Sequence, residues 1–369
     1  MEQSLSDSER RDWLRLARTA NVGPVTFAGL MARFGSAREA LRELPRLARR
    51  GGGKQFEIPH LDEAAREIDA TAKIGGRIIA GCEPDFPQGL AALDPPPPVI
   101  SLLGHAVLLR REMIAIVGAR NASALGRRLA GNLAGDLSRE GLVVVSGLAR
   151  GIDAAAHEAA LEGGTIAVVA GGVDNIYPPE NAALYESIRA RGAIISEMPL
   201  GQMPQARHFP RRNRLIAGLS RGVVIVEAAE RSGSLITANY ALEQNREIFA
   251  VPGSPLDPRA RGTNRLIREG ATLTESAEDV LAVLRPMLGH DFREPTEVPP
   301  QPLPDSAVLE AEADRIRALV EEAIGPTPVE IDELIRLCGA PAAAVLTVVL
   351  ELELAGRLSR QRGNRVGWL

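Results

Sequence analysis

Short apolar runs alternate with helical patterns through the middle of the chain. Six runs rich in β-branched residues predict strands at 113–118, 142–147, 165–172, 193–197, 222–228 and 247–253. Between them, the segments 123–141, 153–164 and 181–192 have helical patterns. Strands that are apolar on both faces are typical of a buried parallel sheet. The pattern therefore predicts an α/β fold with a doubly wound, mostly parallel sheet.

The pattern changes on both sides of this block. Residues 1–72 lack strand signals and predict a small N-terminal helical domain, whereas residues 73–286 form the sheet-containing core. Residues 287–306 include the proline-rich stretch EPTEVPPQPLPDS and predict a semi-extended linker. The chain thus divides into three domains joined in part by a linker.

The last segment, residues 307–369, predicts a small domain of its own. A helix is expected near 328–337 and a turn at Gly339 and Pro341. A second helix then runs to Ala355, and a hairpin follows over 357–368. Two helices followed by a hairpin predict a C-terminal winged-helix-like domain.

Composition limits the possible partners. The chain has 369 residues, 45% hydrophobic and 24% charged, as expected for a globular protein of two or three domains. A net charge of −4 and a pI near 5.9 exclude a generally basic protein, so any anion site must be local. Lys54 and Lys73 are the only lysines. The other cations are arginines, whose planar guanidinium suits phosphate.

The sequence also predicts a cytoplasmic protein without a metal site. The N-terminus has no signal-peptide core, and no run reaches the ~18 to 20 apolar residues of a membrane span. Cys82 and Cys338 form no CxxC pair and are expected to be reduced thiols. The five histidines form no metal-binding pair.

Ligands of a doubly wound sheet bind beyond the carboxyl ends of its strands, so the loops there carry the candidate site. After the first strand, Gly118 permits a tight backbone, Arg120 offers a cation and Ser123 is a candidate helix cap. The sequence has no GxGxxG motif and no Walker lysine, which argues against NAD and ATP. No cofactor is expected.

The loop after the second strand is glycine-rich. Ser146, Gly147 and Gly151 are expected to direct backbone N–H groups toward a ligand, and Asp153 to cap the next helix. His157 is expected to be a structural histidine packed against this loop. The alternative, a catalytic role, lacks a nucleophile nearby in the sequence.

Two later loops complete the set. Asp174 and Tyr177, after the third strand, are expected to fix their loop rather than to touch a ligand. Ser232, Gly233 and Ser234 precede a helix whose N-terminus forms another anion site.

The stretch RHFPRRNR at 207–214 concentrates positive charge inside 198–226, a range without Asp or Glu. A helix from Arg211 would direct its apolar residues to the core and leave its arginines on an exposed first turn. Cations oppose the dipole at a helix N-terminus, so a bound phosphate backbone is the simplest reason for them. Phe209 is a candidate for stacking on an unpaired base; the alternative is a hydrophobic staple beside solvated arginines.

Several phosphate cradles without a base, a nucleophile or a metal cluster favour a polymer over a mononucleotide. An exposed phenylalanine favours a single strand, whose bases are free to stack. The residues therefore predict a protein that binds single-stranded nucleic acid and is not an enzyme.

Ordered motifs in the middle block, among them SGLARGIDAAAH, GGVDNIYPPENAAL, FPRRNRLIAGLS and GTNRLIREGA, resemble those of the DNA-processing protein A (DprA/Smf) family. The resemblance implies a Rossmann-like core that binds single-stranded DNA, forms homodimers and loads the RecA recombinase. It also implies protection of incoming DNA during natural transformation, without enzymatic activity.

Residue by residue, the resemblance implies a phosphate contact by Arg120, although Ala119 stands where the family commonly has serine. The FPxRNR motif begins at Phe209, with Arg211 at its free position; the SGS turn is 232–234, and Gly262 and Asn264 match a late GxN turn. The expected DNA-binding residues are Gly118, Arg120, Ser146, Gly147, Arg207, Phe209, Arg211, Arg212, Asn213, Arg214, Ser232, Gly233, Ser234 and Asn264.

The flanking domains give weaker signals. Residues 20–41 resemble a helix–hairpin–helix or SAM-like segment, which is expected to pack against the core. The second helix of the winged-helix-like domain carries Glu351 and Glu353 and no basic residue, so it is expected to pack internally or to meet protein. Whether the hairpin arginines touch DNA stays open; they are Arg357, Arg360, Arg362 and Arg365.

Two other functions fit the sequence less well. A phosphoribohydrolase on a related core is expected to carry a PGGxGTxxE-type loop, which residues 230–244 lack. A duplex-specific regulator would use the winged helix, and the acidic second helix argues against it.

Overall fold

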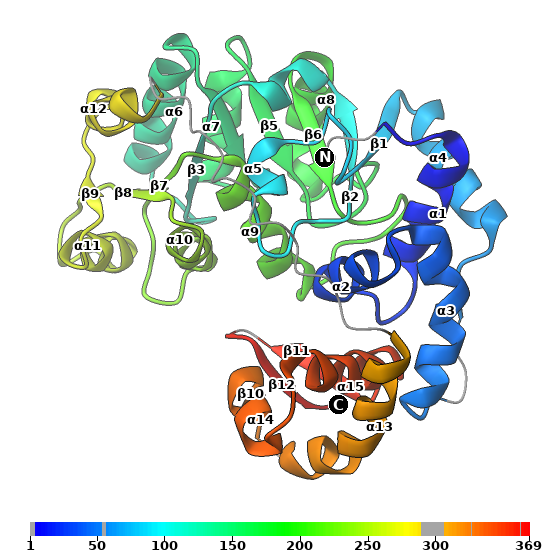
Figure 1. The fold of residues 1–369 in the computed structure, drawn as a ribbon. Helices are drawn as coiled ribbons and strands as arrows, with labels where there is room; N and C mark the ends of the chain where they lie inside the picture. The colour runs from blue at the N-terminus through cyan, green and yellow to red at the C-terminus, as the bar shows by residue number, and fades with distance from the viewer. Residues whose placement is uncertain (1–3, 54–56, 289–305, 326, 362) are drawn as a thin grey trace. The chain divides into compact units, whose positions relative to one another are not determined.

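The computed structural model describes residues 4–53, 57–288, 306–325, 327–361 and 363–369 (Figure 1). Contacts divide the chain into two compact units. Residues 1–4 and 65–293 form the core unit; residues 5–64 and 294–369 form the flanking unit. The domain boundaries expected from the sequence stay predictions, and most of the expected linker lies outside the described residues.

The core unit is built on one nine-stranded sheet with the order β1-β2-β6-β5-β4-β3-β7-β8-β9. The strands from β6 to β9 pair in parallel, while β1 and β2 extend the β6 edge in antiparallel fashion. The strands are β1 (Gly76–Ala80), β2 (Val99–Gly104), β3 (Met113–Gly118), β4 (Val143–Ser146), β5 (Thr165–Val168), β6 (Ala193–Ser196), β7 (Gly222–Val226), β8 (Glu247–Ala250) and β9 (Thr272–Leu273).

Helices cover both faces of this sheet (Figure 1). Ala115 and Val145 point into one apolar cluster, and their neighbours Ile114 and Val144 point into the other. The helices are α5 (Gln88–Ala91), α6 (Ala124–Arg139), α7 (Ile152–Ala160), α8 (Ala182–Arg191), α9 (His208–Leu219), α10 (Gly233–Glu243), α11 (Arg261–Arg268) and α12 (Ala277–Leu288). The predicted α/β fold with a doubly wound, mostly parallel sheet is confirmed.

The six predicted strands correspond to β3 through β8. The sequence analysis did not predict β1, β2 and β9. β1 is an edge strand whose first two residues are not buried, and β9 has only two residues, so neither has the continuous buried run of a central strand. β2 is buried but follows the proline run 95–98, which obscured it.

The flanking unit combines two helical groups from the two ends of the chain. The first group is α1 (Asp7–Arg18), α2 (Pro24–Phe34), α3 (Ala37–Arg50) and the start of α4 (Leu61–Lys73). The second is α13 (Ser306–Ala323), α14 (Ile331–Cys338) and α15 (Ala342–Leu354), with a small sheet of β10 (Val329–Glu330), β12 (Arg365–Trp368) and β11 (Leu358–Gln361). The predicted winged helix is confirmed, with α13 as an additional helix that was not predicted.

The expectation that residues 20–41 pack against the core stays a prediction. Within the flanking unit, Phe27, Leu30 and Leu41 share an apolar cluster with Leu350 and Leu354 of α15. The acidic helix α15 is buried, as the sequence predicted for a helix that packs internally or meets protein.

Within the described ranges, no single helix is long and apolar enough to cross a membrane. The bent pair α14 and α15 meets that length and composition only when the two are combined. Its apolar residues Leu334, Val345 and Val348 lie in the core of the winged-helix domain.

Candidate nucleic-acid interface

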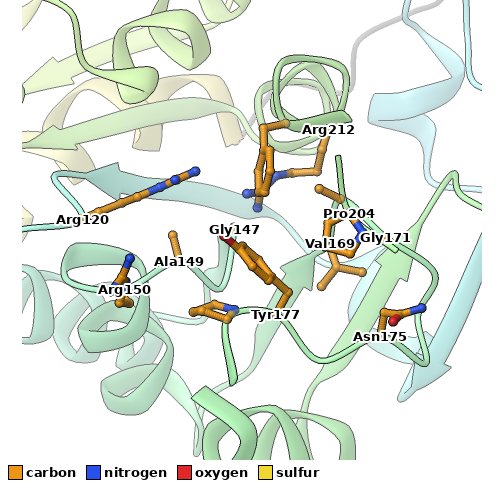
Figure 2. A pocket seen from close by; sticks show the side chains of 13 residues that line it. Arg120, Gly147, Ala149, Arg150, Val169, Gly171, Asn175, Tyr177, Pro204 and Arg212 are labelled. Atoms are coloured by element: carbon orange, nitrogen blue, oxygen red, sulfur yellow. The ribbon is translucent and has the colours of Figure 1, made fainter. Parts of the chain in front are cut away.

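A pocket lies beyond the carboxyl ends of β3, β4 and β5, where their loops meet α9 (Figure 2). Arg120 and Arg150 line it together with Tyr177 and Phe209, and Arg212 reaches it from α9. The space inside the pocket is about 20 Å³, roughly enough for one water molecule. A larger ligand would therefore contact the residues at the mouth of this pocket.

The mouth combines a cation with two aromatic rings. The Cζ atom of Arg120 lies 5.1 Å from the centroid of the Phe209 ring, and the Phe209 and Tyr177 rings lie 5.8 Å apart. Arg120 is exposed and Tyr177 is 43% exposed, so both are accessible to a ligand. This grouping pairs a guanidinium for phosphate with flat apolar faces for bases.

The structure bears on two expectations about these rings. Tyr177 was expected to fix its loop rather than to touch a ligand, and this stays a prediction, although Tyr177 lines the pocket beside Phe209. It is one of three tyrosines in a chain with 3% aromatic residues, and this scarcity was the available signal. The staple alternative for Phe209 is wrong: α9 begins at His208, so Phe209 lies inside the helix rather than before its N-cap.

Arg212 was expected on an exposed turn and is instead buried, at 6% exposure. Arg212 lies three residues before Leu215 and four before Ile216, so α9 places it on their inward stripe rather than on the exposed face. Its Nη1 donates to the carbonyl of Val168 at 2.6 Å, and burial lowers its pKa to about 10. Figure 2 shows its guanidinium directed toward the pocket, facing that of Arg120.

Arg214 is likewise not free on the surface. It pairs with Glu197, whose carboxylate also lies 3.4 Å from Arg211, and Arg214 Nη1 donates to the carbonyl of Pro95. Glu197 is the residue just before the range 198–226, which has no Asp or Glu. Arg211 and Arg214 of that range therefore have an acidic neighbour in the folded protein. Arg211 and Arg207 are exposed, as expected.

The turn after β4 was expected to offer N–H groups to a ligand, and this was wrong. The N–H groups of Gly147 and Ala149 donate to Asp153 Oδ2 at 3.0 and 3.4 Å. Ser146 is fully buried and donates to the carbonyl of Ile116 at 2.6 Å. Asp153 does not cap α7, whose N-cap is Gly151; its carboxylate replaces the expected anion instead. Burial raises the pKa of Asp153, and the Arg212 cation opposes that rise.

His157 is a structural histidine, as expected. Its Nε2 accepts from the N–H of Leu148 at 3.3 Å, and its Nδ1 lies 2.7 Å from Thr165 Oγ1, which donates to the carbonyl of Val144. These bonds require a neutral ring with the proton on Nδ1. Burial lowers the pKa of His157 to about 3, in agreement with that state.

The remaining expected residues hold loops in place. A Cβ at Gly118 would lie 1.8 Å from the carbonyl oxygen of Val226, so only glycine fits there. Asn264 is bonded through both side-chain atoms to Gly253, at 3.1 and 2.8 Å. Asp174 fixes its loop as expected, by accepting from the N–H of Gly201.

The serine turn forms the start of α10. Ser232 is its N-cap, with its Oγ 2.8 Å from that of Ser234, and Asn213 of α9 donates to the carbonyl of Gly233 at 3.3 Å. The turn is thus tied to α9, although it does not line the pocket. Across the residues that the structure describes, no group of three or more His, Cys, Asp or Glu could hold a metal ion.

Comparisons with known proteins cover most of the chain. A family model described as DNA recombination-mediator protein A matches residues 77–285. A DprA-like N-terminal helix–hairpin–helix model matches 7–70, and a DprA winged-helix model matches 299–364.

Relatives and solved structures agree with these matches. Protein Smf of Synechocystis is 33% identical over 98% of this chain and 99% of its own length. DNA processing protein DprA of Bacillus subtilis is 46% identical over 59% and 75%. The structure of DprA from Streptococcus pneumoniae aligns with a TM-score of 0.63 at 35% identity, covering 76% of this chain and 98% of that one. DprA from Helicobacter pylori, described with a unique single-stranded DNA binding mode, aligns with a TM-score of 0.53 at 30% identity, over 57% and 96%.

Proposed function

The chain belongs to the DprA/Smf family of DNA recombination-mediator proteins, and on this premise we propose that it binds single-stranded DNA at the pocket beyond β3–β5. The proposal depends chiefly on the placement of exposed Arg120 over the ring of Phe209, with Tyr177 alongside. Stacking on aromatic rings and pairing with phosphate are the two interactions that hold an unpaired strand.

The expected DNA-binding residues divide into three groups. Arg120, Phe209, Arg207 and Arg211 are proposed to contact DNA, with Tyr177 added. Residues whose polar groups are engaged within the protein are proposed to position them; they are Gly118, Ser146, Gly147, Arg212, Asn213, Arg214 and Asn264. The turn 232–234 is proposed to contact phosphate beyond the pocket.

The biological role follows the family resemblance. The protein is proposed to protect incoming DNA and to load the RecA recombinase during natural transformation, as a cytoplasmic homodimer. It is proposed to act by binding alone. The internal hydrogen bonds of Asp153 and His157 support this, because a general acid or base must face its substrate.

The test is fluorescence anisotropy with labelled oligo-dT of several lengths and a matched duplex, at two salt concentrations. Affinity should rise with length, fall steeply with salt and favour the single strand. Phe209→Ala should cost ~1 to 3 kcal/mol of binding, and Arg120→Ala should lower the salt slope by about one.

Two controls make the result interpretable. Arg128→Ala removes a cation from the exposed face of α6, away from the pocket lining, and should leave both the affinity and the slope unchanged. A mononucleotide that competes as well as the oligonucleotide, or is turned over, would instead favour the phosphoribohydrolase alternative.

A further inference from the structure

Helix α15 is covered on two sides. The consecutive residues 347–352 are all buried, which exceeds one helical turn. Val345, Val348 and Leu352 pack inside the winged-helix domain. Leu350 and Leu354 instead join the apolar cluster of the N-terminal helices. In a helix–turn–helix the second helix is the one that enters the DNA groove; here that position belongs to α15.

Oppositely charged residues on α3 and α13 form ion pairs where the N-terminal helices contact the winged-helix domain. Arg46 and Arg50 lie four residues apart on α3, and Glu310 and Asp314 lie four apart on α13. Arg46 donates two bonds to Glu310, at 2.7 and 2.8 Å, and Arg50 Nη2 lies 2.7 Å from Asp314. A bidentate arginine–carboxylate pair fixes orientation as well as charge.

The most buried charge in the contact is Glu351 of α15, whose side chain is fully buried. It accepts from Arg50 Nε at 2.8 Å and pairs with Arg317 of α13. An unpaired buried carboxylate is costly, and Glu351 is paired from two sides, by Arg317 of α13 and by Arg50 of α3.

Gly51, at the C-terminus of α3, sets the closeness of the contact. A Cβ at this position would lie 2.0 Å from the carbonyl oxygen of Glu351 and 2.5 Å from its carbon. These are backbone atoms that cannot rotate away. Arg357 also donates to the carbonyl of Gly51, at 3.3 Å.

We propose that the winged-helix domain of this protein is a protein-docking domain, and that its partner is the N-terminal helical domain of the same chain. The face of α15 that carries Leu350, Glu351 and Leu354 is the docking surface. A groove-reading helix must expose hydrogen-bond donors and cations. α15 exposes neither of these, and its acidic residue Glu351 forms an ion pair with Arg50 of α3.

The first test is hydrogen exchange of the full-length protein with Gly51→Ala. The added methyl group would clash with the backbone of Glu351 inside the flanking unit. Amides of α15 and of residues 44–51 should therefore exchange at least about tenfold faster than in the unaltered protein. Peptides of the core unit should be unchanged. Gly29→Ala is the matched control, because a Cβ at that helical glycine meets nothing within 4 Å. Equal exchange in the two variants would overturn the proposal.

The second test uses charge, in case Gly51→Ala perturbs folding. Arg46→Ala should speed exchange in α15, and Arg46→Lys should restore part of the protection because it keeps the charge. Arg49→Ala, at an exposed neighbour on the same helix, should have no effect. The proposal fails if Arg46→Ala behaves like Arg49→Ala.

The third test separates docking from DNA reading. Gly51→Ala should bind duplex DNA as the unaltered protein does, within about twofold, and light scattering should give the same mass for both. A gain of about tenfold in duplex affinity would mean that the contact masks a DNA-binding element instead. A loss of mass would mean that the partner is a second copy of the chain.

Discussion

At the residue scale, buried polar side chains beneath the pocket hold the site in place. Arg212, Asp153 and His157 lie beneath the surface that Arg120 and Phe209 form above them. Gly147 completes this arrangement, because a Cβ there would lie 1.9 Å from Arg212 Nη1. The motif FPRRNR therefore contains both the ring that is proposed to contact DNA and an arginine that is buried in the scaffold.

Arg212→Ala should destabilise the protein more than it weakens the DNA salt slope. It removes the cation beside buried Asp153 and the bond to Val168, and breaking a buried charge pair costs roughly 3 to 5 kcal/mol. Chemical denaturation measures the loss. Arg207→Ala, at an exposed position, should change stability by less than about 0.5 kcal/mol. A lowered salt slope with unchanged stability would place Arg212 on phosphate after all.

His157 should make the protein acid-sensitive. Its pKa is lowered to about 3 from an ordinary value of 6.5, so between these pH values the unfolded chain binds a proton that the native protein excludes. The free energy of unfolding should therefore fall as pH drops through this window, by roughly 1 kcal/mol per unit, and stay constant above it. Denaturation across pH 3.5 to 8 tests this against His157→Gln. The variant should show the weaker dependence, and parallel curves would contradict the assignment.

At the scale of elements, the site depends on how closely β3 and β7 approach. These neighbours are the point where strand order reverses in the sheet, which is where open α/β sheets bind ligands. Glu227, just after β7, accepts from the N–H of Ser123 at 2.8 Å and so fixes the start of α6. Arg120 follows β3, so in the chain it lies between the close approach of β3 to β7 and the hydrogen bond of Ser123 to Glu227.

Gly118→Ala should disrupt this pair of strands. The new methyl group would meet the backbone of Val226, and strain of this kind costs typically ~1 to 3 kcal/mol. We expect lower thermal stability together with weaker DNA binding, since Arg120 follows two residues later. Gly233→Ala adds the same methyl group where nothing lies within 4 Å, and should keep wild-type stability. Equal melting temperatures for the two variants would refute the close approach.

At the scale of the whole molecule, the chain has two units with separate apolar cores. The pocket belongs to the core unit alone, because its lining residues run from Arg120 to Arg212. Units with independent cores need not unfold in one step.

Calorimetry should therefore resolve two unfolding transitions, and oligo-dT should raise the midpoint temperature of only one of them. A ligand at about 100 times its Kd stabilises the state that binds it by ~2.7 kcal/mol. Gly51→Ala should lower the midpoint temperature of the other transition and leave that of the DNA-sensitive transition unchanged. A single transition that shifts as a whole with DNA would contradict independent units.

The sequence by itself determined the fold class and the family. Strands buried on both faces must be apolar throughout, so β3 to β8 were visible as runs, and the motifs after them carried the resemblance. The absence of basic residues from α15 argued against a DNA-reading helix and predicted that it packs internally or meets protein, because a helix that reads DNA needs cations and hydrogen-bond donors. Arg120 and Phe209 were identified for the same reason, as residue types suited to phosphate and bases.

Only the tertiary structure decided which charged groups are available. Arg212 and Arg214 look alike in sequence to Arg207 and Arg211, but Arg212 is buried on the inward face of α9 and Arg214 is largely covered and paired with Glu197. Glu197, Asp153 and the N–H groups of the turn after β4 satisfy one another across loops, and no local pattern encodes such pairing. Ionic and hydrogen-bond partners are chosen by distance in space, whereas the sequence records only distance along the chain.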